Sequence, residues 1–304
     1  MRPLLDMDTI QIEVTSACVH ECSNCTRLVG HSKPFMMTMD EFVNAVDSLI
    51  DYPKMVGMMG GEPLIHPLFE EMCSYLRTRI PRERCGLWST LPKGRERLAP
   101  VVAETFGSVL LNDHSHGDLY HGPILVSPED LGMDSFTMWY RVHHCWIQNS
   151  WSASITPRGA FFCEVSAALD YLFQGPGGWP VEPGWWKRTP KDFTEQMESS
   201  CTRCGAPYQL RARRDTDGID DISYSNLQRL AELRSPKVGR GRFAVYTEGV
   251  TGEEFHLNSF RREFDYFQKI AARYGLGLRP NTIGYLEPFL TREANKMLPE
   301  EVSQ

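Results

Sequence analysis

Three cysteines lie within one eight-residue segment near the start of the chain. The segment reads Cys18-Val-His-Glu-Cys22-Ser-Asn-Cys25 and follows a short apolar run, Ile10–Thr15. Thiolates bind tetrahedral zinc and cubane iron–sulfur clusters, and both kinds of site need four ligands. Because this loop supplies three, either a fourth protein ligand lies elsewhere or one position is open to an exogenous molecule.

A second motif, Met58-Met59-Gly60-Gly61-Glu62-Pro63, ends another apolar run. In this order, a C-x3-C-x2-C loop after a first strand and a GGEP turn after a second resemble the radical S-adenosylmethionine (radical SAM) superfamily. The resemblance implies that the three cysteines hold a 4Fe–4S cluster whose fourth iron is chelated by S-adenosylmethionine. It also implies that the turn formed by Gly60, Gly61, Glu62 and Pro63 meets the methionine part of this cofactor. The alternative is a structural zinc loop followed by a chance turn.

Further polar residues lie where the same resemblance places cofactor contacts. Many members carry an aromatic residue before the third cysteine, which packs against the adenine. Here that residue is Asn24, which can form hydrogen bonds but offers no ring. Ser89 and Thr90 end a predicted third strand and Asn112 follows a fourth, so we expect contacts to cofactor or substrate. Ordinary capping of the strand ends is the alternative for these three residues.

Four cysteines in the second half form another group: Cys145, Cys163, Cys201 and Cys204. Between the first two, the alternating runs 152–156 and 160–163 are joined by Pro-Arg-Gly, which predicts a β-hairpin. The other two form a C-x2-C pair, so four thiols complete a ligand set for zinc or a cubane. The pattern resembles the twitch auxiliary-cluster domain, a shortened relative of the SPASM domain, and the spacing of its first two cysteines is similar to that of a radical SAM cyclitol dehydrogenase. The resemblance implies a second 4Fe–4S cluster, with a zinc ribbon as the alternative.

Strand and helix signals alternate before residue 140, which predicts an α/β fold with parallel βα units. Helices are expected after the capping box at 38–41, after Pro67 and over 95–106; strands are expected at 10–15, 55–59, 86–91, 108–111 and 136–142. We predict a partial (βα)6-type radical SAM barrel over residues 1–142. A small auxiliary-cluster domain made of the hairpin and a helix at 165–173 follows over 143–210, and an α+β extension occupies 211–304. Cys73 and Cys85 are expected to be buried apolar residues.

The extension matches no known pattern. A helix at 227–233, a strand at 243–246 and a helix at 260–274 are expected from their apolar spacing. The glycine- and arginine-containing segment 237–242 is interpreted either as a phosphate site or as a solvated loop. Four histidines, His114, His116, His143 and His144, lie near the predicted open end of the barrel and are candidate proton acceptors or hydrogen-bond donors to substrate, with ordinary surface or hydrogen-bonded histidines as the alternative.

Composition limits the possible functions. The chain has 304 residues with 41% hydrophobic and 23% charged residues, which is ordinary for a globular protein. A net charge of −7 argues against sequence-independent nucleic-acid binding, and neither a signal peptide nor a membrane span is expected. Nine cysteines in an apparently cytoplasmic chain indicate metal ligands before disulfides. The oligomeric state cannot be deduced.

The predicted function is hydrogen abstraction from a small polar substrate, such as a sugar, cyclitol or nucleotide sugar, by a 5′-deoxyadenosyl radical. A dehydrogenation is favoured because an auxiliary cluster can accept an electron, and a flavodoxin or ferredoxin is the expected electron donor. Modification of a peptide or protein side chain is the alternative. Cys18 lies almost at the first residue, so we expect no leader-binding domain before the barrel. Redox-neutral epimerisation or rearrangement also remains open.

Overall fold

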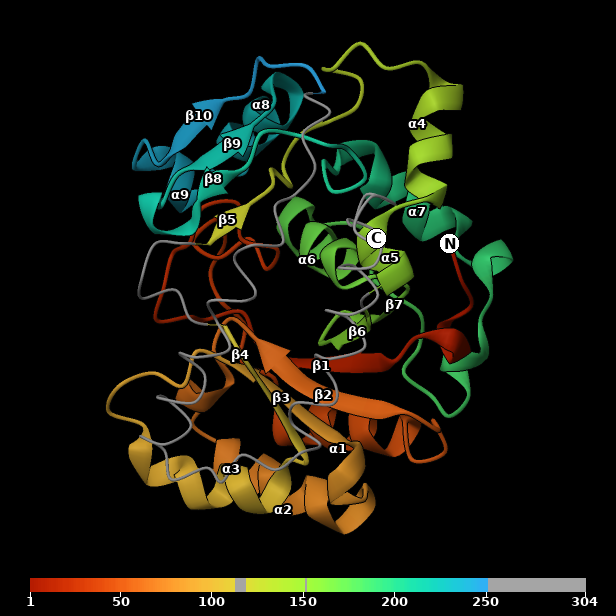
Figure 1. Cartoon of the computed structure of the whole chain (residues 1–304), viewed down its shortest axis with the longest axis vertical. Helices are drawn as coiled ribbons and strands as arrows, with labels where there is room; N and C mark the ends of the chain where they lie inside the picture. The colour runs from red at the N-terminus through yellow and green to blue at the C-terminus, as the bar shows by residue number, and fades with distance from the viewer. Residues whose placement is uncertain (113–118, 151, 251–304) are drawn as a thin grey trace, which may run out of the picture.

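The computed structural model describes residues 1–112, 119–150 and 152–250, and its main feature is one six-stranded sheet (Figure 1). The strand order is β4-β3-β2-β1-β6-β7. The strands are β1 (Thr9–Thr15), β2 (Met55–Gly60), β3 (Cys85–Ser89), β4 (Ser108–Leu111), β6 (Ser152–Thr156) and β7 (Gly159–Phe161). All neighbours pair in parallel except β6 and β7, which form an antiparallel hairpin. The predicted α/β class and the predicted hairpin are therefore confirmed.

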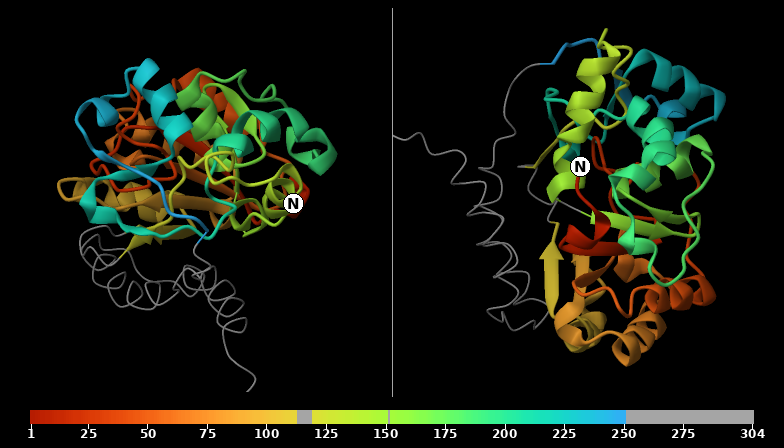
Figure 2. Two further views of the ribbon diagram at one scale, coloured as in Figure 1. Left: turned by 90° about the horizontal axis from the view of Figure 1, so that it is seen from above. Right: turned by 90° about the vertical axis from the view of Figure 1, so that its right-hand side faces the viewer.

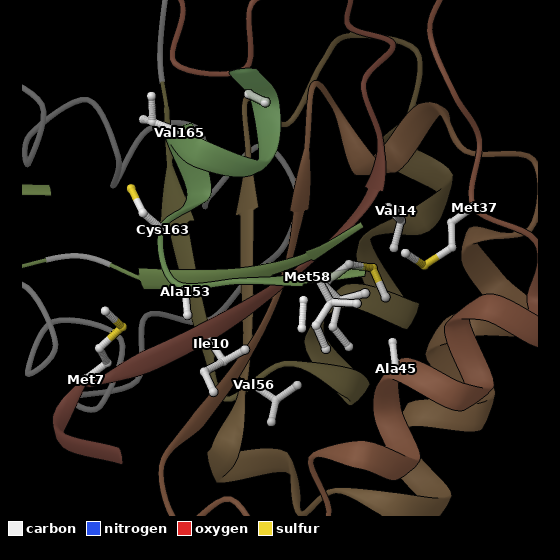
Figure 3. Packing of buried hydrophobic residues seen from close by; sticks show 14 of the residues in the cluster. Met7, Ile10, Val14, Met37, Ala45, Val56, Met58, Ala153, Cys163 and Val165 are labelled. Carbon is white, nitrogen blue, oxygen red and sulfur yellow. The ribbon is translucent and has the colours of Figure 1, made fainter. Parts of the chain in front are cut away.

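Three helices cover one side of this sheet: α1 (Met39–Ser48), α2 (Phe69–Arg79) and α3 (Ala99–Thr105) (Figure 1). The capping box at the start of α1 is present, because Thr38 and Glu41 bind each other's backbone N–H groups. Apolar side chains of β1 and β2, including Ile10, Val56 and Met58, lie in the core on this side (Figure 3). Cys73 and Cys85 are fully buried in the same core, as expected.

Four further helices lie on the opposite side of β1 from α1–α3 (Figures 1 and 2). They are α4 (Ser135–His143), α5 (Trp146–Ser150), α6 (Glu164–Phe173) and α7 (Thr194–Ser200). Helix α6 begins directly after Cys163, as predicted. Because β6 pairs with β1, the hairpin extends the main sheet, and residues 1–142 share one sheet with part of the segment 143–210. The division of the chain into domains stays a prediction.

The predicted strand at 136–142 is wrong, because these residues lie in α4. Asp134 caps this helix, since its carboxylate accepts hydrogen bonds from the backbone N–H of Thr137 at 2.9 Å and from its hydroxyl at 2.7 Å. Phe136 and Tyr140, one helical turn apart, are exposed, whereas Val142 is buried. The aromatic and β-branched residues that suggested a strand therefore follow helical spacing instead.

The last described part of the chain is small and mixed. Strand β8 (Arg213–Arg214) pairs with β5 (Tyr120–His121), and β9 (Asp220–Ile222) pairs with β10 (Phe243–Val245). Helices α8 (Tyr224–Glu232) and α9 (Pro236–Gly239) connect β9 to β10. The helix predicted at 227–233 and the strand predicted at 243–246 are confirmed, with ends that differ by a few residues. The segment 237–242 begins in α9 with the buried Lys237 and is exposed over 239–242, and a phosphate site there stays a prediction. The helix predicted at 260–274 lies outside the described residues.

No helix in the described part of the chain is long and apolar enough to cross a membrane.

Candidate functional site

The first cysteine loop begins where β1 ends, beside the end of β2. Backbone hydrogen bonds join the two strand ends: the N–H of Gly61 donates to the Thr15 carbonyl and that of Glu62 to the Ala17 carbonyl, both at 2.8 Å. A Cβ atom on Gly60 would lie 2.1 Å from the Thr15 oxygen, and one on Gly61 would lie 2.2 Å from the Ala17 oxygen. The two glycines are therefore required because the backbone of the cysteine loop touches the turn.

Glu62 is fully buried and binds the end of β3. Its carboxylate accepts hydrogen bonds from the Ser89 hydroxyl at 2.7 Å and from the Thr90 N–H and hydroxyl at 2.7 and 2.8 Å. Burial raises the pKa of Glu62, and these hydrogen bonds oppose the rise. Pro63, next in the chain, begins a short 3-10 helix. Asn112, which follows β4, is exposed, and its backbone N–H donates to the Ser89 carbonyl at 2.9 Å. Two of the predicted contact residues, Ser89 and Thr90, thus bind the carboxylate of Glu62, which belongs to the predicted turn.

The thiols of the first loop lie close to one another. Cys22 is buried, and Cys18 and Cys25 are partly buried. Burial, the Cys25 thiol and the Glu62 carboxyl together raise the pKa of Cys18 to about 12, despite backbone N–H groups that point toward its sulfur. Burial is also the main cause of the raised pKa of Cys22, and both other thiols contribute to it. The three thiols of this loop are thus close enough to raise one another's pKa, and their role as ligands of one cluster stays a prediction.

Asn24, between these cysteines, is buried and faces the last part of the chain. Its amide nitrogen donates to the His121 carbonyl at 3.1 Å and to a carboxylate oxygen of Asp221 at 2.9 Å. Its amide oxygen accepts from the Asp221 N–H at 2.8 Å. The side chain thus binds β9, and a contact between Asn24 and a cofactor stays a prediction.

The four cysteines of the second group also come together, although they derive from three separate segments. All four are buried and line a small cavity of about 20 Å³, whose other walls include Met1, Phe162 and Leu169. Burial raises the pKa of Cys163 to about 12, and the neighbouring Cys145 adds to the rise. The thiols of Cys201 and Cys204 have pKa values raised by burial and by the other thiols of the group.

Backbone N–H groups point at three of these sulfur atoms, and that of Ala206 is directed at Cys204. Those of Val165 and Ser166, in the first turn of α6, favour the thiolate form of Cys163. Those of Ile147 and Gln148, in α5, do the same for Cys145. Amide hydrogen bonds to sulfur are a usual part of the surroundings of iron–sulfur clusters, where they stabilise the ligated thiolate.

A buried ion-pair network, which the sequence analysis missed, lies between the two cysteine groups. Arg27 pairs through one nitrogen with Glu13 of β1 and through another with Glu164 at 3.2 Å. Ser154 donates to Glu13 at 2.9 Å, and Ser152 donates to Glu164 at 2.7 Å. Arg27 follows Cys25 by two residues and Glu164 directly follows Cys163, so the network joins both cysteine groups. Burial would lower the pKa of Arg27, but the two carboxylates and the thiols of Cys25 and Cys163 raise it overall.

Beside this network lies Gln11, whose buried amide has no hydrogen-bond partner within residues 1–112, 119–150 and 152–250. Gln11 and Glu13 share one face of β1, because side chains alternate along a strand. The sequence indicates this polar face, because Thr9, Gln11, Glu13 and Thr15 alternate with Ile10, Ile12 and Val14. The alternation distinguishes an apolar face from a polar one, but it does not reveal that the polar face is buried.

The candidate histidines do not gather at the site in the part of the chain that can be assessed. His143 and His144 are exposed at the end of α4, where the His144 ring lies 2.7 Å from the Tyr140 carbonyl. His114 and His116 lie outside the described residues.

The solved structures that resemble parts of this chain include those of BtrN and SuiB. BtrN in complex with AdoMet and 2-DOIA is 16% identical, with a TM-score of 0.45, over 66% of this chain and 93% of that chain. SuiB of Streptococcus suis bound to S-adenosylmethionine is 10% identical, with a TM-score of 0.32, over 88% of this chain and 48% of that chain. No family model matches the chain, and no curated protein matches it. At such low identity, function must be inferred from the residues of this chain.

Proposed function

We propose that this chain is a radical SAM enzyme in which Cys18, Cys22 and Cys25 hold a 4Fe–4S cluster with one iron open to S-adenosylmethionine. One observation carries the proposal: the three-thiol loop lies directly against the Gly60-Gly61-Glu62 turn, joined to it by two backbone hydrogen bonds. Three grouped thiols fit a cluster that keeps one position free. When bound, the cluster and S-adenosylmethionine supply a 5′-deoxyadenosyl radical that abstracts hydrogen from a substrate carbon.

We assign a second 4Fe–4S cluster to Cys145, Cys163, Cys201 and Cys204. Four buried thiols around a cavity, with N–H groups directed at three of them, make a suitable donor set. Among the residues that the structure describes, no three cysteine, histidine or acidic side chains converge on a single metal ion. Four buried thiols suit zinc and a cubane alike, so a zinc ribbon stays the alternative assignment for this group. A fully ligated cluster supplies an electron acceptor, which favours net oxidation of the substrate.

The chain's own residues favour a small polar substrate, such as a sugar, cyclitol or nucleotide sugar. Gln11 has two buried amide atoms without a described partner, and each such atom costs about 1–3 kcal/mol. Hydroxyl groups of a substrate are the simplest partners for this amide. The buried charges of Glu13 and Arg27 beside it add polar surroundings in which such a molecule can be oriented. Glu62 holds the ends of β2 and β3 together by accepting hydrogen bonds from Ser89 and Thr90. It thereby maintains the edge of the sheet at which we propose cofactor contacts for Gly60, Gly61, Pro63, Asn24 and Asn112.

The remaining parts of the proposal follow from this chemistry. An electron donor such as a flavodoxin or ferredoxin, and a cytoplasmic location where thiols stay reduced, are assigned on the same grounds. The second candidate function is modification of a peptide or protein side chain. A redox-neutral epimerisation or rearrangement becomes the better assignment if the second cysteine group holds no cluster.

The test is iron and sulfide per chain after anaerobic reconstitution. We expect about eight irons in the wild type and about four in each of two variants, one with Cys18, Cys22 and Cys25 changed to Ala and one with the other four changed. With S-adenosylmethionine and a reductant, the wild type and the second variant should release 5′-deoxyadenosine, and the first should not. A wild type without iron, or 5′-deoxyadenosine from the first variant, would refute the proposal.

A further inference from the structure

The part of the chain after residue 213 packs against the first cysteine loop (Figure 1). The N–H of Ser23 donates to the Asp215 carbonyl at 2.8 Å, and the N–H of Ile219 donates to the Ser23 hydroxyl at 3.0 Å. The N–H of Lys237 donates to the Gly30 carbonyl at 3.0 Å. Segments separated by about two hundred positions thus bind each other through backbone groups, and the loop has a fixed partner on its outer side.

Within this contact, the side chain of Lys237 is fully buried and ends at a cysteine of the first group. Its Nζ donates to the Cys22 carbonyl at 3.0 Å and to an oxygen of Asp220, also at 3.0 Å. A buried ammonium group is costly unless a carboxylate and further acceptors compensate for its lost hydration. Here the acceptors are one carboxylate and the backbone carbonyl of the cysteine itself.

Asp220 binds the same loop at two more points. One of its carboxylate oxygens accepts from the Asn24 N–H at 2.5 Å, and the other lies 2.6 Å from Nε2 of His31. The second ring nitrogen of His31 lies 2.8 Å from the Ser235 hydroxyl. The carboxylate and the ammonium group therefore bind three residues of the loop together, namely Cys22, Asn24 and His31.

We propose that Lys237 is a positioning residue of the first cysteine site, and that it acts through the Cys22 carbonyl to fix the turn that presents the Cys22 thiol. The proposal rests on the proposed function, because it takes Cys22 as an iron ligand. Asn24 and His31 can be held by Asp220 alone, whereas the Cys22 carbonyl is bound by Lys237. Removing a group that hydrogen-bonds to a metal-ligating residue usually lowers the affinity of the site for its metal.

The test compares Lys237→Met with Arg240→Met in the reconstituted full chain. Arg240 is a matched control, since it comes from the same segment and binds Glu21 of the same loop at 2.8 Å, but this pair is half exposed. We expect Lys237→Met to lose first-site iron to a chelator about tenfold faster than the wild type, and Arg240→Met to match the wild type. First-site iron is the phase of release that is missing when Cys18, Cys22 and Cys25 are changed to Ala.

A spectroscopic measurement separates positioning from simple destabilisation. The electron paramagnetic resonance spectrum of the reduced first cluster should change in Lys237→Met and stay unchanged in Arg240→Met. The double variant Asp220→Asn/Lys237→Met leaves no unpaired buried charge, so it should fold even if the single variant does not. It should still release iron fast, because the Cys22 carbonyl has lost its donor.

The outcomes are distinct. Equal release rates and equal spectra for Lys237→Met, the double variant and Arg240→Met, with a loaded wild type, would overturn the role of Lys237 alone. If the variant with Cys18, Cys22 and Cys25 changed to Ala holds as much iron as the wild type, the proposed function is overturned, and this proposal with it.

Discussion

Replacement of Arg27 should strongly destabilise the fold. It is buried between Glu13 and Glu164, and Arg27→Met would leave both carboxylates buried without their cation. Removing one partner of a buried ion pair costs about 3–5 kcal/mol. Ser154 and Ser152 would still donate one hydrogen bond to each carboxylate, so we expect the lower part of this range. At about 2 °C per kcal/mol for a chain of this size, the melting temperature should fall by roughly 6–8 °C.

The loss should depend on pH in a defined direction. Burial already raises the pKa of Glu13 in the folded protein, and removal of Arg27 would raise it further. A carboxyl whose pKa is higher in the folded state weakens the fold at pH values above its unfolded pKa, about 4.3 for Glu. The penalty shrinks as the pH falls through the folded pKa and is absent below the unfolded one. Arg27→Met should therefore be least damaging at acidic pH.

The assay is thermal unfolding of the metal-free protein at one heating rate, followed by circular dichroism between pH 5 and 8. Arg79→Met is the control, because its pair with Asp47 is about 40% exposed on the Arg side and should contribute at most about 1 kcal/mol. The triple variant Glu13→Gln/Arg27→Met/Glu164→Gln should regain most of the lost stability, since no charge is left unpaired. A melting temperature of Arg27→Met within about 1 °C of the control at pH 8 would refute the reasoning.

Three further predictions follow from single contacts. Gly61→Ala should lose first-site iron but keep second-site iron, because its Cβ would lie 2.2 Å from the Ala17 oxygen; unchanged iron content would contradict this. Gln11→Leu should raise the free energy of unfolding by about 1 kcal/mol in urea titrations, because it removes two buried polar atoms without described partners; a loss of that size would show that the amide is bound. Burial favours a higher pKa for Asp220, but the hydrogen bond from His31 and the charge of Lys237 lower its pKa overall. The contribution of Asp220 to the free energy of unfolding is therefore present above pH about 3.9 and is lost as the pH falls further. Asp220→Asn should flatten the dependence of stability on pH in that acidic range, and an unchanged slope would argue against the pairing.

Local sequence patterns predicted the sheet well, because each strand and helix carries its own signal. The capping box at Thr38, the apolar alternation along β1 and the Pro-Arg-Gly turn of the hairpin all act within a few residues. The error at 136–142 has a local cause too, since aromatic residues are common in strands and the capping role of Asp134 was overlooked. Candidate ligands were predictable for the same reason, because cysteine spacing is written in the chain itself.

The groups around the cysteines were not predictable, because they pair over long distances. Lys237 and Cys22 are 215 positions apart, and nothing near either residue indicates the other. Glu13 and Arg27 are close in sequence, but their burial depends on β6 pairing with β1 and bringing Ser154 beside them. A lone charged residue on a strand usually faces solvent, so sequence reasoning assigns it to the surface unless the strand is known to be covered on both sides.

The two buried cations, Arg27 and Lys237, each lie beside one or more of the cysteines. Arg27 lies near the thiols of Cys25 and Cys163, and Lys237 lies near Cys22, so each cysteine group has a cation beside it. In the metal-free chain these cations are partly compensated by Glu13, Glu164 and Asp220, at the cost of burying every charge involved. Thiolates that bind iron add negative charge in the same places, where burial would otherwise oppose it. If the two cysteine groups hold iron as we propose, the two cations make more favourable interactions in the loaded protein than in the empty one.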